Sequence, residues 1–140
     1  MGLMLVLVCA YTLALYALGF YLESTNGIRW LSLAAADLLE RQGVRTEVLK
    51  LNQISPLEYE TLAPWLAGKK LLAVAEDAFG AGCVGQRTAA ILAQHGQAPE
   101  KLVLINLGKT FLPEGTVPQL EHQAGIDAAG IARAVQEART

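Results

Sequence analysis

The sequence predicts an α/β domain in which a parallel sheet of about four strands lies between two layers of helices. Short apolar runs of strand length alternate with longer segments in which apolar residues recur at helical spacing. The chain has 140 residues, 53% of them hydrophobic, which is enough for a single domain with a buried core. Strands joined through helices make right-handed crossovers, so the elements are expected in the order βαβαβαβα over residues 1–140.

The first apolar stretch, residues 3–22, carries no charged side chain and allows two interpretations. As one helix it would be long enough to cross a bilayer. As a strand over residues 3–9 followed by a helix over 12–22, it matches the continuous apolar run of a central parallel strand. No Lys or Arg precedes it, so the basic flank of a signal peptide or an oriented anchor is missing. We therefore favour the strand, with a membrane-anchored domain as an alternative.

The next segments each have a start or stop signal. Residues 23–27 have the composition of a turn, and residues 28–42 show a helical pattern that Gly43 ends. Residues 44–51 alternate apolar and polar side chains as a second strand. Pro56 is expected to begin a short helix that runs to Leu66, with Trp65 packed against the sheet.

The same alternation continues to the end of the chain. A strand is predicted over residues 70–75, a helix over 86–94, a strand over 101–107 and a short helix over 117–123. Asp127 is a good N-cap for the last helix, whose apolar stripe follows it.

Three glycines between the third strand and its helix are candidates for a phosphate-binding turn. Gly80, Gly82 and Gly85 fit the G-x-G-x-x-G pattern, and a helix N-terminus presents free N–H groups to a phosphate. However, this turn does not follow the first strand, and the next strand ends near Asn106 and Gly108, with no carboxylate for a ribose. Close packing of the helix on the sheet is the favoured interpretation, and a nucleotide- or phosphate-binding module is the alternative.

Charge, cysteines and histidines exclude several other classes. The net charge of −2 gives no electrostatic reason to expect nucleic acid as a partner. Cys9 and Cys83 lack metal-ligand spacing, and His95 and His122 are too scattered for a zinc site. We expect reduced thiols in a cytoplasmic protein. A helix start could activate Cys83 as a nucleophile, but a small buried residue is the favoured interpretation.

Several segments together resemble one enzyme family. Residues 33–57 are similar to the helix, strand and Pro-Leu segment in the C-terminal domain of transketolase-like, thiamine-diphosphate-dependent enzymes. The family's V-x-E-E motif is similar to Val-Ala-Glu-Asp at residues 74–77. Its G-G-x-G motif is similar to Gly-Cys-Val-Gly at residues 82–85, with Cys83 in place of the second glycine. Residues 106–115 and 124–131 resemble the G-L-P-D-x-F-I-x-H-G and L-G-L-D-A-E-G-I motifs of 1-deoxyxylulose-5-phosphate synthase, the most similar subfamily. Lys109 replaces the Asp of these motifs, Glu114 the His, and Thr12 a glycine after the first strand.

The resemblance implies a third domain without the catalytic machinery. In the full enzymes thiamine diphosphate and Mg²⁺ bind to two earlier domains, whose Gly-Asp-Gly…Asn motif does not occur in this sequence. The chain is therefore expected to hold no cofactor or metal and to be inactive alone. It is expected to serve as an assembly or dimerisation domain with the strand order 2-1-3-4. Glu76, Phe111 and Gly115 lie in the matching motifs and are candidates for structural or interface roles.

Residues 13–30 fall outside the family pattern and are interpreted as an insertion. They follow the first strand, at the edge of the sheet where open α/β folds place ligands and contacts. Leu15, Leu18, Phe20 and Tyr21 are apolar side chains of this stretch. Because a soluble monomer seldom exposes a large apolar patch, we expect part of the segment to be buried in a homodimer interface, or else against the chain's own sheet.

Overall fold

The computed structural model describes residues 3–9 and 21–140, with side chains from residue 27 onward. Four parallel strands form one sheet in the order β2-β1-β3-β4, as the sequence predicts. They are β1 (Leu3–Cys9), β2 (Thr46–Leu51), β3 (Lys69–Glu76) and β4 (Lys101–Ile105). In the register, Val6 lies opposite both Val48 and Ala73, and Ala73 lies opposite Val103.

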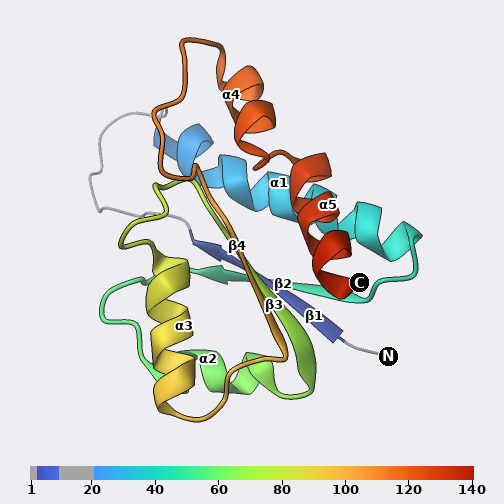
Figure 1. Ribbon diagram of the computed structural model, residues 1–140, viewed down its shortest axis with the longest axis vertical. Helices are drawn as coiled ribbons and strands as arrows, with labels where there is room; N and C mark the ends of the chain where they lie inside the picture. Colours follow the sequence, from blue (N-terminus) through green and yellow to red (C-terminus); the bar gives the residue numbers. More distant parts are fainter. Residues whose placement is uncertain (1–2, 10–20) are drawn as a thin grey trace.

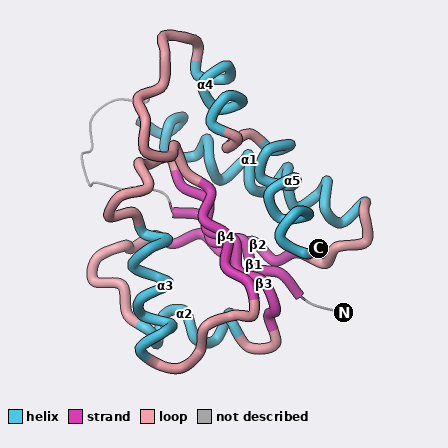
Figure 2. The backbone as a smooth tube through the Cα atoms, viewed as in Figure 1, coloured by secondary structure: helices cyan, strands magenta, loops and turns pink. Residues whose placement is uncertain are grey.

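Helices cover both faces of the sheet and make the expected three layers. Figure 1 shows α1 (Tyr21–Arg41) and α5 (Ala128–Arg139) on one face, with α2 (Tyr59–Leu66) and α3 (Val84–Gln94) on the other. The short helix α4 (Val117–Ala124) lies beyond the end of the sheet where the strands finish, next to α1 and α5 (Figure 2). This arrangement confirms the α/β class with parallel strands.

The apolar core has two halves, one on each face, and β3 contributes to both. Leu71, Ala73 and Ala75 point toward α1 and α5, while Leu72 and Val74 point toward α2 and α3. On the first face the deepest partners are Leu39, Ile131 and Val135; on the second they are Leu62, Val84 and Leu92. Burial on both faces explains why β3 is a continuous apolar run rather than an alternating one.

Helix α1 corrects the prediction of a turn at residues 23–27. The helix begins at Tyr21 and runs through these residues without a break. Ile28 is 4% exposed and belongs to the core half that α1 and α5 cover. A helix that begins about two turns earlier gives the Ile28 N–H a carbonyl partner within the helix, and this outweighs the weak helix propensity of Ser, Thr, Asn and Gly.

Two expectations for the segment around α2 are also wrong. The Ser55–Pro56 peptide bond is cis, and the helix begins only at Tyr59, because Leu57 is buried in the core ahead of it and Glu58, the N-cap residue, has an extended backbone. Trp65 is 48% exposed and does not pack against the sheet. Leu62 and Leu66, one turn apart, occupy that face of the short helix instead.

The single membrane helix over residues 3–22 is excluded by β1. Residues 3–9 are a central strand that pairs with β2 and β3, so they cannot belong to a bilayer-spanning helix. Across residues 3–9 and 21–140, none of the helices has the length and apolar character needed to cross a bilayer. Leu15, Leu18 and Phe20 of the predicted insertion lie outside the described residues, and Tyr21 is the first residue of α1.

Candidate functional site

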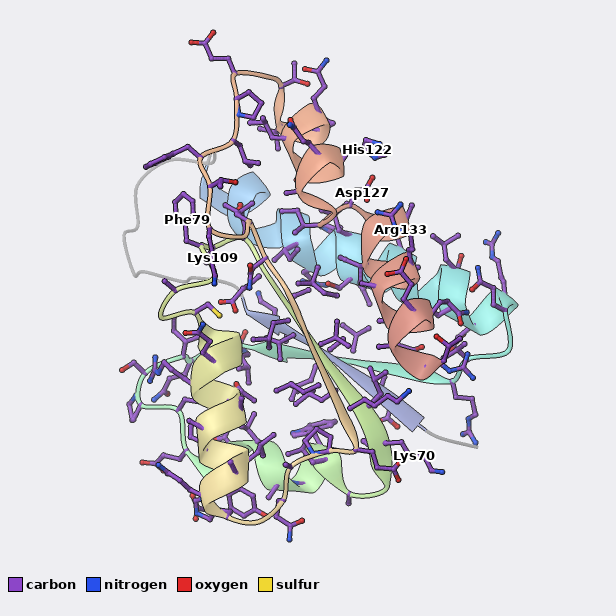
Figure 3. The ribbon with its side chains drawn as sticks, in the orientation of Figure 1. Lys70, Phe79, Lys109, His122, Asp127 and Arg133 are labelled. Carbon is purple, nitrogen blue, oxygen red and sulfur yellow. The ribbon has the colours of Figure 1, made fainter. Side chains whose placement is uncertain are left out.

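The candidate site is the edge of the sheet where β3 and β4 end, formed by the loops over residues 77–83 and 106–116. Figure 3 shows Phe79 and Lys109 together at this edge, whereas Lys70 lies at the opposite end of the strands. Open α/β sheets place their ligands and contacts at this carboxyl edge. The two loops contain Gly80 and Gly82 of the glycine turn and the motif at residues 106–115, and Gly85 follows in the first turn of α3.

Glu76, the last residue of β3, closes the N-terminus of α3. Its side chain is 1% exposed, and its two carboxylate oxygens accept hydrogen bonds from the backbone N–H groups of Val84 and Gly85, both at 2.9 Å. These N–H groups belong to the first turn of α3, where a helix has no backbone acceptors of its own. A buried charged acceptor therefore satisfies the helix end from within the chain.

The same hydrogen bonds use backbone N–H groups of the glycine turn that a phosphate would need as donors. The Val84 and Gly85 N–H groups point at Glu76, and the N–H of Gly82 donates to Oε1 of Gln86 at 3.0 Å. A Cβ added at Gly85 would lie 2.6 Å from Cδ2 of Leu104 and 3.2 Å from Oε1 of Glu76. The helix start is thus close-packed against β3 and β4, which favours the packing interpretation of these glycines.

Cys83 is a small buried residue at the N-cap position of α3. Its side chain is 4% exposed, and the Nδ2 group of Asn106 lies 3.9 Å from its sulfur. Burial raises the pKa of the Cys83 thiol, and the neighbouring Glu76 carboxylate raises it further. The thiol is therefore protonated and shielded at neutral pH, which is the opposite of what a nucleophile needs.

The two loops are joined to each other by backbone hydrogen bonds. Gly80 donates to the carbonyl of Gly108 at 2.8 Å, and Leu107 donates to the carbonyl of Ala78 at 3.0 Å. Oδ1 of Asn106 accepts from the N–H of Gly108 at 2.9 Å, which fixes the turn after β4. Asn106 and Gly108, which stand where a nucleotide-binding domain would have a carboxylate for the ribose, therefore hold the two loops together.

The two joined loops each contribute one ring to an aromatic pair. The rings of Phe79 and Phe111 meet edge to face, with centroids 5.7 Å apart. Phe79 is 45% exposed and Phe111 is 92% exposed. The sequence pointed to Phe111 but not to Phe79, because only the tertiary pairing of the loops brings the two rings together. Gly115 lies elsewhere, against Leu120 of α4.

A polar cluster links α4 to α5 beside this edge (Figure 3). Nδ1 of His122 lies 2.7 Å from Oδ2 of Asp127, and the other oxygen of Asp127 accepts from the N–H of Gly130 at 2.7 Å. Asp127 is thus the predicted N-cap of α5. Burial raises the pKa of Glu121 on α4, and the nearby carboxylates of Asp77 and Asp127 add to this.

The two histidines lie in separate parts of the fold. His95 stacks on Tyr59 with ring centroids 4.2 Å apart, in the layer of α2 and α3, whereas His122 is on α4. Among the side chains that the structure describes, no three of His, Cys, Asp and Glu gather as metal ligands would.

Replacing Asp127 by alanine is expected to destabilise the domain by about 1 kcal/mol at pH 7, because the Gly130 N–H loses its cap. The His122 hydrogen bond lowers the pKa of Asp127, against a smaller effect of burial. A lowered pKa means that this stabilisation is present above the ordinary pKa of about 4 and is lost as the pH falls through the folded-state value.

Urea unfolding of both proteins at pH 7 and at pH 3 measures this difference. The gap between wild type and variant should be smaller at the lower pH. The matched control is Asp37→Ala, which removes an exposed ion pair with Arg41 and should change stability by less than about 0.5 kcal/mol. An equal gap at the two pH values would contradict the assigned role of the carboxylate.

Comparisons with known proteins agree with this arrangement. The family model described as "Transketolase, C-terminal domain" matches residues 28–131. The chain belongs to the transketolase C-terminal domain family. It matches 1-deoxy-D-xylulose-5-phosphate synthase 1 of Geobacter sulfurreducens with 30% identity over 105 residues, which is 75% of this chain and 16% of that protein. The synthase of Thiobacillus denitrificans is 32% identical over 106 residues, or 76% of this chain and 17% of its own.

This transketolase C-terminal domain also resembles a solved structure described as "Split gene transketolase, inactive beta4 tetramer". The TM-score is 0.74 with 21% identity, and the match covers 98% of this chain and 39% of that one. At this level of identity the likeness establishes the fold. The chain spans about a sixth of the length of the two synthases that it matches.

Proposed function

We propose that the chain is the assembly domain of a transketolase-like, thiamine-diphosphate-dependent transferase of the 1-deoxyxylulose-5-phosphate synthase type. In this proposal the chain contributes structure and contacts, while thiamine diphosphate and Mg²⁺ are held by other domains or subunits. Membership of the C-terminal domain family and the small share of the synthases that the chain spans support this division of roles.

The carboxyl edge supplies the observation that carries the proposal. Some of its polar groups are satisfied within the chain: Glu76 is hydrogen-bonded to the start of α3, and the backbones of the two loops are hydrogen-bonded to each other. Its aromatic groups are turned outward, as Phe79 and Phe111 are. Exposed aromatic side chains on a rigid base are typical of protein interfaces, where they carry much of the binding energy.

We therefore propose that the Phe79 and Phe111 face contacts the subunit that holds the cofactor. Strand β1, which precedes the predicted insertion at residues 13–30 in the sequence, ends at the same edge of the sheet. Leu15, Leu18, Phe20 and Tyr21 remain candidates for the same interface or for a homodimer contact.

The isolated chain is expected to show no turnover with pyruvate and glyceraldehyde 3-phosphate in the presence of thiamine diphosphate and Mg²⁺. It should also give no heat of binding when titrated with thiamine diphosphate. Product formation by the purified chain alone, at a rate proportional to its concentration, would contradict the proposal. A full-length synthase is the positive control for the assay.

The same titration series distinguishes the alternative function. Saturable binding of NAD, ATP or inorganic phosphate that Gly82→Ala abolishes would favour a nucleotide- or phosphate-binding module. We expect no such binding, because the N–H groups of Val84 and Gly85 already donate to Glu76. Sequencing the adjacent coding region tests the assembly role independently, since we expect a segment with a diphosphate-binding motif beside it.

A further inference from the structure

Strand β4 lies at the edge of the sheet but has the composition of an interior strand. Val103 and Ile105 point toward α5 and pack with that half of the core. Leu102 and Leu104 point to the opposite face and are 36% and 37% exposed. Apolar side chains on both faces are typical of a strand that is buried on both faces, but Leu102 and Leu104 leave one face of β4 only partly covered. Among the described residues, β3 is the only strand that pairs with β4.

The other edge of the sheet, β2, is protected in the usual way. It carries Glu47 and Lys50, and Oε2 of Glu47 pairs with Nζ of Lys69 at 2.9 Å. Charged side chains on an edge strand oppose the addition of another strand. Strand β4 has only Lys101, at its first residue, so its free edge lacks this protection.

We infer that β4 pairs with the β4 of a second copy of this chain, antiparallel about a two-fold axis, so that the two sheets become one. Directly opposed residues in an antiparallel pair share a face of the sheet, so an axis perpendicular to the sheet must pass through a residue position. An axis at Val103 sets Leu102 of each copy opposite Leu104 of the other copy.

Self-complementarity is the reason to choose a second copy as the occupant. Only the axis at Val103 pairs every exposed leucine of the strand with another leucine. An axis at Leu102 would set Leu104 opposite Glu100, and an axis at Leu104 would set Leu102 opposite Asn106. With the axis at Val103, Lys101 lies opposite Ile105, so no like charges meet across the pair. The four leucines then cover one another beside the two α3 helices.

This surface is separate from the aromatic face and does not rest on the proposed function. The β4 pair uses the outer side of the strand, which leaves Phe79 and Phe111 at the carboxyl edge free for another subunit. Either proposal can fail while the other stands.

Cysteine cross-linking of the full chain tests the register. In a Cys9→Ala, Cys83→Ala background, Val103→Cys places two thiols across the axis with Cα atoms about 5 Å apart, within the range of a disulfide. Mild oxidation should give covalent dimers in high yield. Lys101→Cys is the control, because its two copies would lie about 13 Å apart along the strands. Equal cross-linking of the two variants would show random collision and overturn the proposal.

Sedimentation velocity tests the contact itself. The wild-type chain should sediment as a dimer, and Leu104→Glu, a change at a half-exposed side chain, should give a folded monomer with an unchanged far-UV signal. Val117→Glu, at a 67% exposed position on α4, should remain dimeric. A monomeric wild type, or a Leu104→Glu variant that stays dimeric, would overturn the proposal. A monomeric wild type would also indicate that any strand added to β4 comes from a different polypeptide.

Discussion

Replacing Glu76 by alanine is expected to destabilise the domain by about 2–6 kcal/mol, the largest effect of any single substitution proposed for this chain. The change removes both acceptors of the Val84 and Gly85 N–H groups, which are buried in the first turn of α3. Each buried N–H without a partner costs about 1–3 kcal/mol. Urea unfolding followed by far-UV circular dichroism measures the loss.

A graded series shows whether the carboxylate acts as a cap. Glu76→Gln keeps one acceptor oxygen but turns an NH₂ group toward the second N–H, so its loss of stability should lie between those of wild type and the alanine variant. The matched control is Glu100→Gln, the same chemical change at an exposed side chain, and should shift stability by less than about 0.5 kcal/mol. A Glu76→Ala variant as stable as the wild type would exclude this role for Glu76.

The sequence predicted the sheet well because each strand carries its own signal. Residues 71–75 of β3 are buried on both faces and form a pure apolar run, and the alternation of strands with helices leaves few possible topologies. Helix α1 was predicted less well, because residues 23–27 have turn-like composition. There the burial of Ile28, a tertiary effect, decides the local structure.

The candidate site was predicted only in part, because some of its contacts depend on local sequence and others on tertiary structure. Asp127 could be predicted as a cap from local sequence, since a cap needs only the helix that follows it, and Phe111 was a candidate for a structural or interface role because it lies in a family motif. The bonds from the start of α3 to Glu76 span eight and nine residues, and the Phe79–Phe111 contact joins two loops. A motif alone does not say whether a helix N-terminus faces a phosphate or a carboxylate of its own chain.

Replacing Gly85 by valine is expected to destabilise the domain by about 1–3 kcal/mol through overpacking. A Cβ at this position would lie 2.6 Å from Cδ2 of Leu104 and 3.2 Å from Oε1 of Glu76. Leu104 is partly exposed and can turn aside, whereas the Glu76 oxygen is held by the N–H of Gly85 itself. The cost therefore arises where the new side chain pushes α3 away from the carboxylate. Thermal and urea unfolding measure it.

Gly27→Ala is the matched control, because it adds a methyl group to a helical glycine with open surroundings. The nearest atom to the added Cβ would be Oε1 of Glu121, at 3.9 Å. This change should raise stability by about 0.5–1 kcal/mol through the better helix propensity of alanine, the opposite sign to Gly85→Val. If Gly85→Val instead kept its stability and abolished the binding of inorganic phosphate, the glycine would serve a ligand rather than close packing of α3 on the sheet.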